Sequence, residues 1–361
     1  MNNQYMYPYF DVWGEADYLS GNTCFNLEKF QRSESGKNLM NARSLMERFE
    51  DVDDPALLAL WEEMGVRCEV RVTKGQKWLC FVPLEAYGKT EEKYPVLMVF
   101  RPVGLLAEAF YQYNIEQSAQ GEYITMIYSD EDFDVNDVYF DMLQEVLSDF
   151  PADPTRVYTT GHSHYGELAM EFTRRFHQHI AAIAQQGDSA GIILNFYGMT
   201  QEKADLMHSY DMPLINVAGT TEFNGIFPIN QDAPGVPEDS PYRKSKFPMT
   251  KERRIEDWKV RLYAMRCPVP SDEVILAAGR DKAERELGFP CDRTELLYAE
   301  GSECYVGDVK NVDGKYHFRT IALENVPHTT TRLMHVLTWS FLRRFAKNLE
   351  TGEVVELYDI L

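Results

Sequence analysis

Short apolar runs alternate with helix-like segments through the middle of the chain, and this alternation constrains the fold more than any other feature. The runs have the length and β-rich composition of strands buried on both faces, and lie at 95–100 (PVLMVF), 123–128 (YITMIY), 156–160 (RVYTT), 181–186 and 213–218 (PLINVA). Helical spacing of apolar residues occupies the intervals 105–120, 135–150 and 167–180. The pattern predicts an α/β fold with a mostly parallel, doubly wound sheet.

The flanking regions depart from this alternation. Residues 1–65 are polar and aromatic-rich before a helical stretch, and we interpret them as an N-terminal extension that acts as an arm or a lid. Residues 68–83 predict a hairpin. Clustered prolines break the pattern after residue 225, so 225–311 is predicted to be a long excursion from the sheet, inserted before the last strand at 316–326. An amphipathic helix is expected over 332–348.

Charge and cysteine usage exclude several classes of function. The chain has 57 acidic and 36 basic residues, for a net charge of −21, which disfavours nucleic acid or an anionic membrane as a partner. The six cysteines are dispersed and form no CxxC pair, so neither a zinc site nor a disulfide framework is predicted. No signal peptide or long apolar run is present, and we expect a cytoplasmic protein.

The motif Gly161-His162-Ser163 joins the predicted strand 156–160 to a predicted helix. A nucleophile elbow requires this arrangement, because a tight turn between strand and helix projects a serine hydroxyl above the sheet. The second glycine of the usual GxSxG pattern is replaced by Tyr165, and Gly166 follows one position later. An ordinary strand-to-helix turn is the alternative, but the flanking elements favour Ser163 as a catalytic nucleophile.

A serine hydroxyl needs a base, and in this type of site the order along the chain is Ser, then Asp or Glu, then His. His328 follows the strand 316–326 and precedes the C-terminal helix, which makes it the predicted base. Glu222 is the first carboxylate after the strand 213–218, and its predicted role is to orient the imidazole. Asp232 is the second candidate for the acid, and Asp308 is a third.

The oxyanion of an acyl-transfer intermediate needs two backbone N–H donors. We predict the amides of His164, the residue after the nucleophile, and Val103, because Pro102 has no N–H. Arg101, Tyr165 and Phe223 are predicted substrate contacts, although Arg101 could instead pair with a nearby acid. Phe227 and Tyr242 are further candidates for an aromatic pocket, with core packing as the alternative.

Residues 66–347 resemble the α/β-hydrolase esterases that include feruloyl esterases and polyhydroxybutyrate depolymerase-like enzymes. The resemblance is carried by these pieces: CEVRV…KWLCFVP before YPVLMVF, DVNDVYFDMLQEVLSDFPADPTRVYTTGHSHYGELA, PLINVAGTTE and NVPHTTTRLMHVLTWSFLRRF. It implies a catalytic domain over 66–361, with Ser163 as nucleophile, Glu222 as acid and His328 as base. The chain departs from the family's pattern at Arg101-Pro102, which replaces His-Gly, at Tyr165, and at Glu222, which replaces Asp.

These observations predict a serine carboxylic-ester hydrolase that acts through an acyl-enzyme on a small or aromatic ester. No cofactor or metal is expected, and the predicted partner is a small-molecule ester. The oligomeric state is left open, including a homo-oligomer formed through the N-terminal arm. A serine peptidase or amidase with the same triad is one alternative. A non-catalytic binding protein of the same fold is another, because of the departures at Arg101-Pro102 and Tyr165.

Overall fold

The computed structural model describes residues 26–46, 54–88, 91–100, 113–128, 137–187, 200–221, 251–327 and 329–358. The chain divides into two compact units. The β5 unit comprises Lys37–Ala184 and Thr330–Leu361, and the β7 unit comprises Met1–Gly36 and Gln185–Thr329. The division falls within one strand, β6 (Ala182–Gln186).

In the β5 unit the strands follow the spatial order β1-β2-β4-β3-β5. Their bounds are Val66–Thr73 (β1), Gln76–Pro83 (β2), Tyr94–Phe100 (β3), Ile124–Tyr128 (β4) and Ala152–His162 (β5). The first two strands form the predicted antiparallel hairpin, and β2 is antiparallel to β4. Strand β3 is parallel to both β4 and β5. This pairing confirms the predicted α/β class with parallel strands at its core.

Helices cover both faces of these strands. Phe100 of β3 packs against α7 (Val138–Asp149) and α8 (His164–Arg175) through Tyr139 and Phe172. Tyr158 of β5 pairs in register with Leu97, so it points to the opposite face, where it contacts Trp339 of α13 (Arg332–Leu342). Every residue of β3 and β4 is buried, as the continuous apolar runs predict for strands covered on both sides.

The remaining elements of the β5 unit are short, and two of them correct the predictions. They are α4 (Pro55–Glu63), η2 (Leu84–Tyr87), α6 (Glu116–Ala119), β11 (Phe345–Lys347) and β12 (Val354–Glu356), while α3 (Glu34–Met46) spans the division at Gly36. Within the described part of the predicted helix 105–120, only α6 is α-helical. The C-terminal helix ends at Leu342 rather than near residue 348, because the Phe345 carbonyl accepts a hydrogen bond from the Tyr158 hydroxyl at 2.7 Å and Phe345 enters β11.

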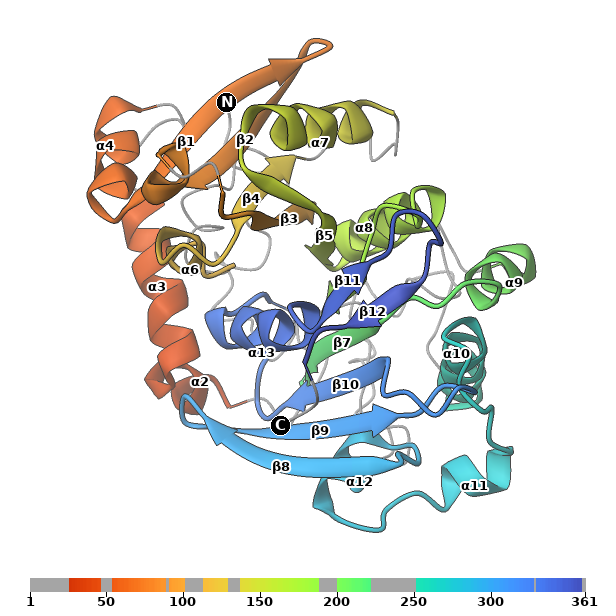
Figure 1. The fold of residues 1–361 in the computed structure, drawn as a ribbon. Helices are drawn as coiled ribbons and strands as arrows, with labels where there is room; N and C mark the ends of the chain where they lie inside the picture. Colours follow the sequence, from red (N-terminus) through yellow and green to blue (C-terminus); the bar gives the residue numbers. More distant parts are fainter. Residues whose placement is uncertain are drawn as a thin grey trace. The chain divides into compact units, whose positions relative to one another are not determined.

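The β7 unit contains a second set of strands in the order β7-β10-β9-β8, which lie side by side in Figure 1. Their bounds are Leu214–Gly219 (β7), Phe318–Leu323 (β10), Ser302–Val309 (β9) and Arg293–Ala299 (β8). Strands β7 and β10 are parallel, whereas β10, β9 and β8 are antiparallel. The helices are α2 (Leu27–Arg32), α9 (Gln201–His208), α10 (Lys251–Ala264), α11 (Asp272–Leu276) and α12 (Lys282–Leu287).

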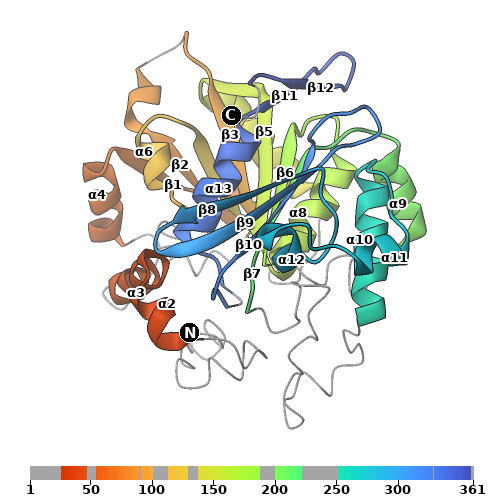
Figure 2. The ribbon, with the colours of Figure 1, turned by 90° about the horizontal axis from the view of Figure 1, so that it is seen from below.

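Strands β8 and β9 overturn part of the prediction for 225–311, since they pair with β10 instead of leaving the sheet. The clustered prolines occur only before residue 249, so they do not interrupt the segment 293–309 that forms these strands. A tight turn at Glu300 and Gly301, both with positive φ (51° and 81°), joins the two strands. Trp258 of α10 stacks on Phe289, which follows α12, with ring centroids 4.3 Å apart, and lies 6.1 Å from the ring of Phe318 in β10. Figure 2 shows α9 beside α10.

Cysteines in the described ranges are free and buried: Cys68, Cys80, Cys267, Cys291 and Cys304. Burial raises the pKa of each of these thiols, which keeps them protonated and poorly nucleophilic. Within the same described ranges, no helix combines the length and the apolar character needed to cross a membrane.

Candidate active site

The turn between β5 and α8 has an unusual backbone geometry. Strand β5 ends at His162, α8 begins at His164, and Ser163 between them adopts φ 54° and ψ −128°. A non-glycine residue in this region carries steric strain, which a structure retains where function requires it. The amide of Gly166 donates to the Ser163 carbonyl at 2.9 Å and tightens the turn. A strained serine between a strand and a helix is the geometry of a nucleophile elbow.

Gly161 allows this turn to form. A Cβ atom at position 161 would lie 2.2 Å from the carbonyl oxygen of Tyr165 and 2.8 Å from the amide nitrogen of Gly166. Both are backbone atoms at the start of α8, so rotation of a side chain cannot relieve the overlap. The tight turn predicted between strand and helix is therefore present, and its close backbone approach requires glycine at 161.

Tyr165 replaces a glycine of the usual motif without obstructing this turn. Its backbone, not its side chain, makes the close approach to Gly161, and the half-buried side chain is accommodated. Helix α8 begins at His164, so its N-terminal end lies at this turn. Negative charge that develops beside Ser163 would therefore meet N–H groups and the positive end of the helix dipole.

In the β7 unit, the carboxyl ends of two parallel strands bring two predicted site loops together. Gly219 at the end of β7 pairs in register with Leu323 at the end of β10. Glu222 follows Gly219 by three positions, and His328 follows Leu323 by five. Parallel neighbours end at the same edge of a sheet, so the chain segments that lead to the predicted acid and base start from adjacent points.

Four hydrogen bonds connect these two loops. The Thr220 amide donates to the Leu323 carbonyl at 2.9 Å, and the Asn325 amide donates to the Thr220 hydroxyl at 2.9 Å. The Val326 carbonyl accepts from both the amide and the hydroxyl of Thr221, at 3.3 and 2.8 Å. These residues were not identified from the sequence. The only available signal was the occurrence of Thr-Thr and Asn directly after strands, where such side chains often bond to backbone groups.

Several predicted site residues lie outside the described part of the chain: Arg101, Val103, Glu222, Phe223, Phe227, Asp232, Tyr242 and His328, together with the side chain of His164. The structure describes Ser163, the backbone of His164, and Tyr165, all of which lie in the β5 unit. The chain segments that precede Glu222 and His328 belong to the β7 unit.

Other candidate acids and bases are committed to partners elsewhere. Asp308, the third candidate for the acid, lies on β9 and is 2% exposed. Its two carboxylate oxygens accept hydrogen bonds from Arg319 at 2.7 and 3.0 Å, which is a structural ion pair. His317 contacts Asp211 at 2.8 Å, and His335 contacts the Tyr123 hydroxyl at 3.0 Å. Asp308, His317 and His335 therefore each have a structural partner within the described part of the chain.

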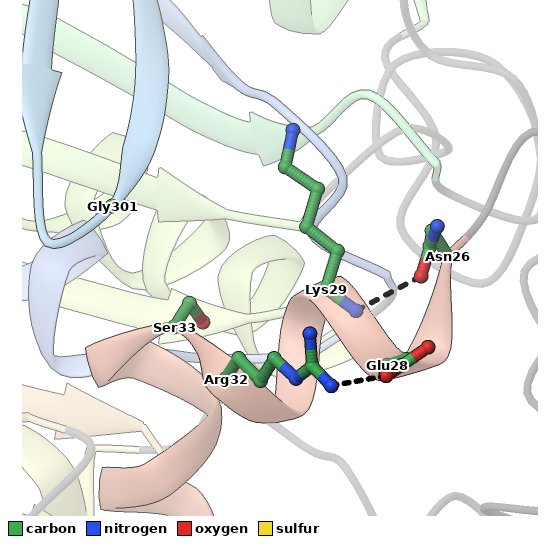
Figure 3. A pocket seen from close by; sticks show the side chains of 6 residues that line it. All are labelled: Asn26, Glu28, Lys29, Arg32, Ser33 and Gly301. Atoms are coloured by element: carbon green, nitrogen blue, oxygen red, sulfur yellow. Dashed lines mark hydrogen bonds and ion pairs between the residues drawn. The ribbon is translucent and has the colours of Figure 1, made fainter.

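A surface pocket lies between α2 and the turn that joins β8 to β9, and Figure 3 shows the residues that line it: Asn26, Glu28, Lys29, Arg32, Ser33 and Gly301. Its cations are paired, Arg32 with Glu28 and Lys29 with Glu324. It contains no nucleophile–base pair and does not resemble a catalytic centre. Within the ranges that the structure describes, no three His, Cys, Asp or Glu side chains are grouped as metal ligands.

Comparisons with known proteins find similar solved structures but no match in sequence. No protein-family model and no curated protein matches it. Similar solved structures include a ferulic acid esterase, with 13% identity and a TM-score of 0.41 over 77% of this chain and 96% of the other. A poly(aspartic acid) hydrolase-1 from Sphingomonas sp. KT-1 has 14% identity and a TM-score of 0.40 over 77% and 98%. An S-formylglutathione hydrolase from Staphylococcus aureus has 13% identity and a TM-score of 0.34 over 44% and 80%. With TM-scores this low, a functional assignment has to rest on the geometry of this chain.

Proposed function

We propose that the protein is a serine carboxylic-ester hydrolase of the α/β-hydrolase fold, with Ser163 as its nucleophile. The observation that supports this proposal most strongly is the strained backbone of Ser163 between β5 and α8, which Gly161 makes sterically possible. An ordinary turn between a strand and a helix does not need a serine at positive φ. The strain is explained if the hydroxyl must be presented to a substrate.

The reaction follows the general logic of activated serines. His328 accepts the hydroxyl proton as the Ser163 oxygen attacks the ester carbonyl, and Glu222 orients the imidazole and stabilises its protonated form. The amides of His164 and Val103 stabilise the oxyanion. Protonated His328 then gives its proton to the departing alcohol, and an acyl-enzyme remains. Water, deprotonated by His328, attacks the acyl group. Protonated His328 then returns its proton to the Ser163 oxygen as the bond to the acyl group breaks and the acid is released.

The loops of the β7 unit support the roles given to Glu222 and His328. The four hydrogen bonds between residues 220–221 and 323–326 hold the two chain segments together immediately before these residues. Arg101, Tyr165 and Phe223 are proposed to contact a small or aromatic ester. A peptidase or amidase would use the same triad, and the substrate panel below distinguishes the two.

The decisive experiment labels the intact protein with a fluorophosphonate probe and identifies the modified residue by mass spectrometry. We expect labelling at Ser163, and turnover of p-nitrophenyl acetate in preference to a peptide anilide. Ser163→Ala should abolish both the labelling and the turnover. Ser340→Ala removes an exposed serine that bonds only to the Leu337 carbonyl, and serves as the matched control with unchanged activity.

Labelling or ester turnover that persists in Ser163→Ala would disprove the assignment of the nucleophile. A well-folded wild type that neither reacts with the probe nor hydrolyses any ester would instead support a non-catalytic binding protein. Preferential cleavage of the anilide would support the peptidase.

A further inference from the structure

The N-terminal helix α2 is attached to the loop that leads from β10 toward His328. The amide of Asn26, the N-cap residue of α2, donates to the Asn325 side-chain oxygen at 2.7 Å. The Asn325 side-chain nitrogen donates back to the Asn26 carbonyl at 2.8 Å. Next to this pair, the Lys29 ammonium contacts the Glu324 carboxylate at 2.6 Å. Residues 299 positions apart in the sequence are thus joined by two reciprocal hydrogen bonds.

Asn325 connects three segments of the β7 unit. Its side chain binds Asn26, its amide binds the Thr220 hydroxyl, and it is itself a loop residue two positions beyond β10. It is 8% exposed and has a φ of 56°, a left-handed conformation that asparagine and glycine tolerate best. Hydrogen bonds to Asn26 and Thr220 therefore fix the position of Asn325, which lies three residues before the proposed base.

A second attachment lies just beyond the C-terminal end of α2, in the first residues of α3. The Glu34 amide donates to the Glu300 carbonyl at 3.3 Å, and the Ser35 hydroxyl donates to the Glu300 carboxylate at 3.2 Å. Glu300 lies in the turn between β8 and β9. Figure 3 shows α2 with Asn26 at its start and Gly301 of this turn across the pocket. The segment that contains α2 is therefore bonded at one end to the loop after β10 and at the other end to the β8–β9 turn. Through these bonds, the turn restrains the position of the loop.

We propose that α2 and Asn325 form a brace that positions the loop carrying His328, which makes Asn325 a positioning residue for hydrolysis. This inference rests on the proposed role of His328 as the base. Proton transfer requires the imidazole to lie within hydrogen-bond reach of the serine, and a misplacement of about 1 Å can reduce the rate about 100-fold. The N-terminal segment is therefore a structural support of the site, in addition to any role as an arm or lid.

The test removes the brace without changing the backbone. Asn325→Gly deletes both side-chain hydrogen bonds and still permits φ near 56°. We expect kcat for p-nitrophenyl acetate to fall about 10- to 100-fold with KM changed less than about 2-fold. Ser35→Ala removes one of the two hydrogen bonds at the other attachment and should lower kcat by less than Asn325→Gly, because the Glu34 amide still bonds to the Glu300 carbonyl. Ser340→Ala, at an exposed serine of α13 outside the brace, is the control, and its kcat should stay within about 2-fold of wild type. Asn325→Asp keeps the acceptor for the Asn26 amide and should recover part of the lost rate.

Hydrogen exchange separates the brace from the chemistry. In Asn325→Gly, the amides of Thr220, Thr221 and Val326 should exchange faster, whereas those of β9 should not change. Unchanged kcat and unchanged exchange in Asn325→Gly, or an equal loss of kcat in Ser340→Ala, would overturn the brace. If the wild type hydrolyses no ester, the proposed function fails. Exchange then still shows whether α2 restrains this loop, while the assignment of Asn325 to catalysis falls with the function.

Discussion

The turn at Ser163 and the loops that follow β7 and β10 are stabilised in different ways. The first is local, because the contacts that define it join residues within the six-residue segment 161–166. The second is assembled from distant parts of the chain: Thr221 and Val326 are 105 positions apart, and Asn26 and Asn325 are 299 apart. A turn defined by neighbouring residues can be recognised from a short motif, whereas loops held together by distant residues depend on the complete fold.

The largest effect is expected at Gly161. Gly161→Ala places a Cβ atom 2.2 Å from the Tyr165 carbonyl oxygen, and this backbone atom cannot move without unwinding the start of α8. We expect a loss of about 4 kcal/mol in the free energy of unfolding, together with the loss of fluorophosphonate labelling at Ser163. Urea unfolding and probe labelling measure the two effects.

Gly307→Ala is the control for Gly161→Ala. Its added Cβ would meet the Cys291 sulfur at 2.5 Å and the end of the Leu287 side chain at 2.6 Å. These are side-chain atoms that can rotate away, so the cost should be about 1 kcal/mol, with labelling unchanged. Equal losses in the free energy of unfolding for Gly161→Ala and Gly307→Ala would mean that the turn at Ser163 is not rigid. The local turn would then not differ from the assembled loops in the way described above.

The second-largest effect is expected at Gly219, the last residue of β7, where the loops after β7 and β10 meet. A Cβ atom at position 219 would lie 1.8 Å from the Val326 carbonyl oxygen. Val326 lies in a loop, so its displacement would not unwind a helix, and Gly219→Ala should cost about 3 kcal/mol, less than Gly161→Ala. The shift would break the hydrogen bonds from Thr221 and separate the segments that lead to Glu222 and His328. We expect kcat to fall more steeply than stability, as steady-state kinetics and urea unfolding can show. Wild-type kcat in this variant would mean that the contact does not position the base.

The same contrast explains what the sequence revealed. The strands β3, β4 and β5, and the elbow at Ser163, were predictable because apolar runs and glycine positions act over a few residues. The hydrogen bonds of Thr221 and Asn325 were not, because their partners are brought close only by the parallel pairing of β7 with β10. Strands β8 and β9 were missed for a related reason: their apolar alternation is weak, and pairing with β10 stabilises them.

Each unit also contains one buried histidine outside the proposed site, and the two have different surroundings. In the β7 unit, His317 contacts the Asp211 carboxylate at 2.8 Å. Burial alone would raise the pKa of Asp211, but the hydrogen bond and charge of His317 lower it overall. In the β5 unit, His335 is fully buried, and its Nε2 contacts only the Tyr123 hydroxyl. Burial without a charged partner lowers the pKa of His335 to about 3.

The last prediction uses pH to separate the two units. Between pH 6.5 and 3, the unfolded chain protonates His335 and the folded chain does not, so acidification destabilises the fold. At about 1.4 kcal/mol per pH unit, the loss is about 2 kcal/mol at pH 5 relative to pH 7. Asp211 has a lowered pKa, so its stabilising contribution persists above 3.8 and declines only below that value. Hydrogen exchange at pH 5 should therefore show α13 losing protection before β7 and β10 do.

His335→Leu tests whether this histidine is the cause. The Tyr123 hydroxyl keeps its hydrogen bond to the Asn114 carbonyl at 3.0 Å, so the substitution leaves no buried donor without a partner. Its free energy of unfolding should then differ between pH 7 and pH 5 by about 2 kcal/mol less than in the wild type. If the wild type and His335→Leu lose the same stability on acidification, another group controls the acid response. The difference between the units would then lie only in how their loops are held, because a buried neutral histidine would no longer distinguish them.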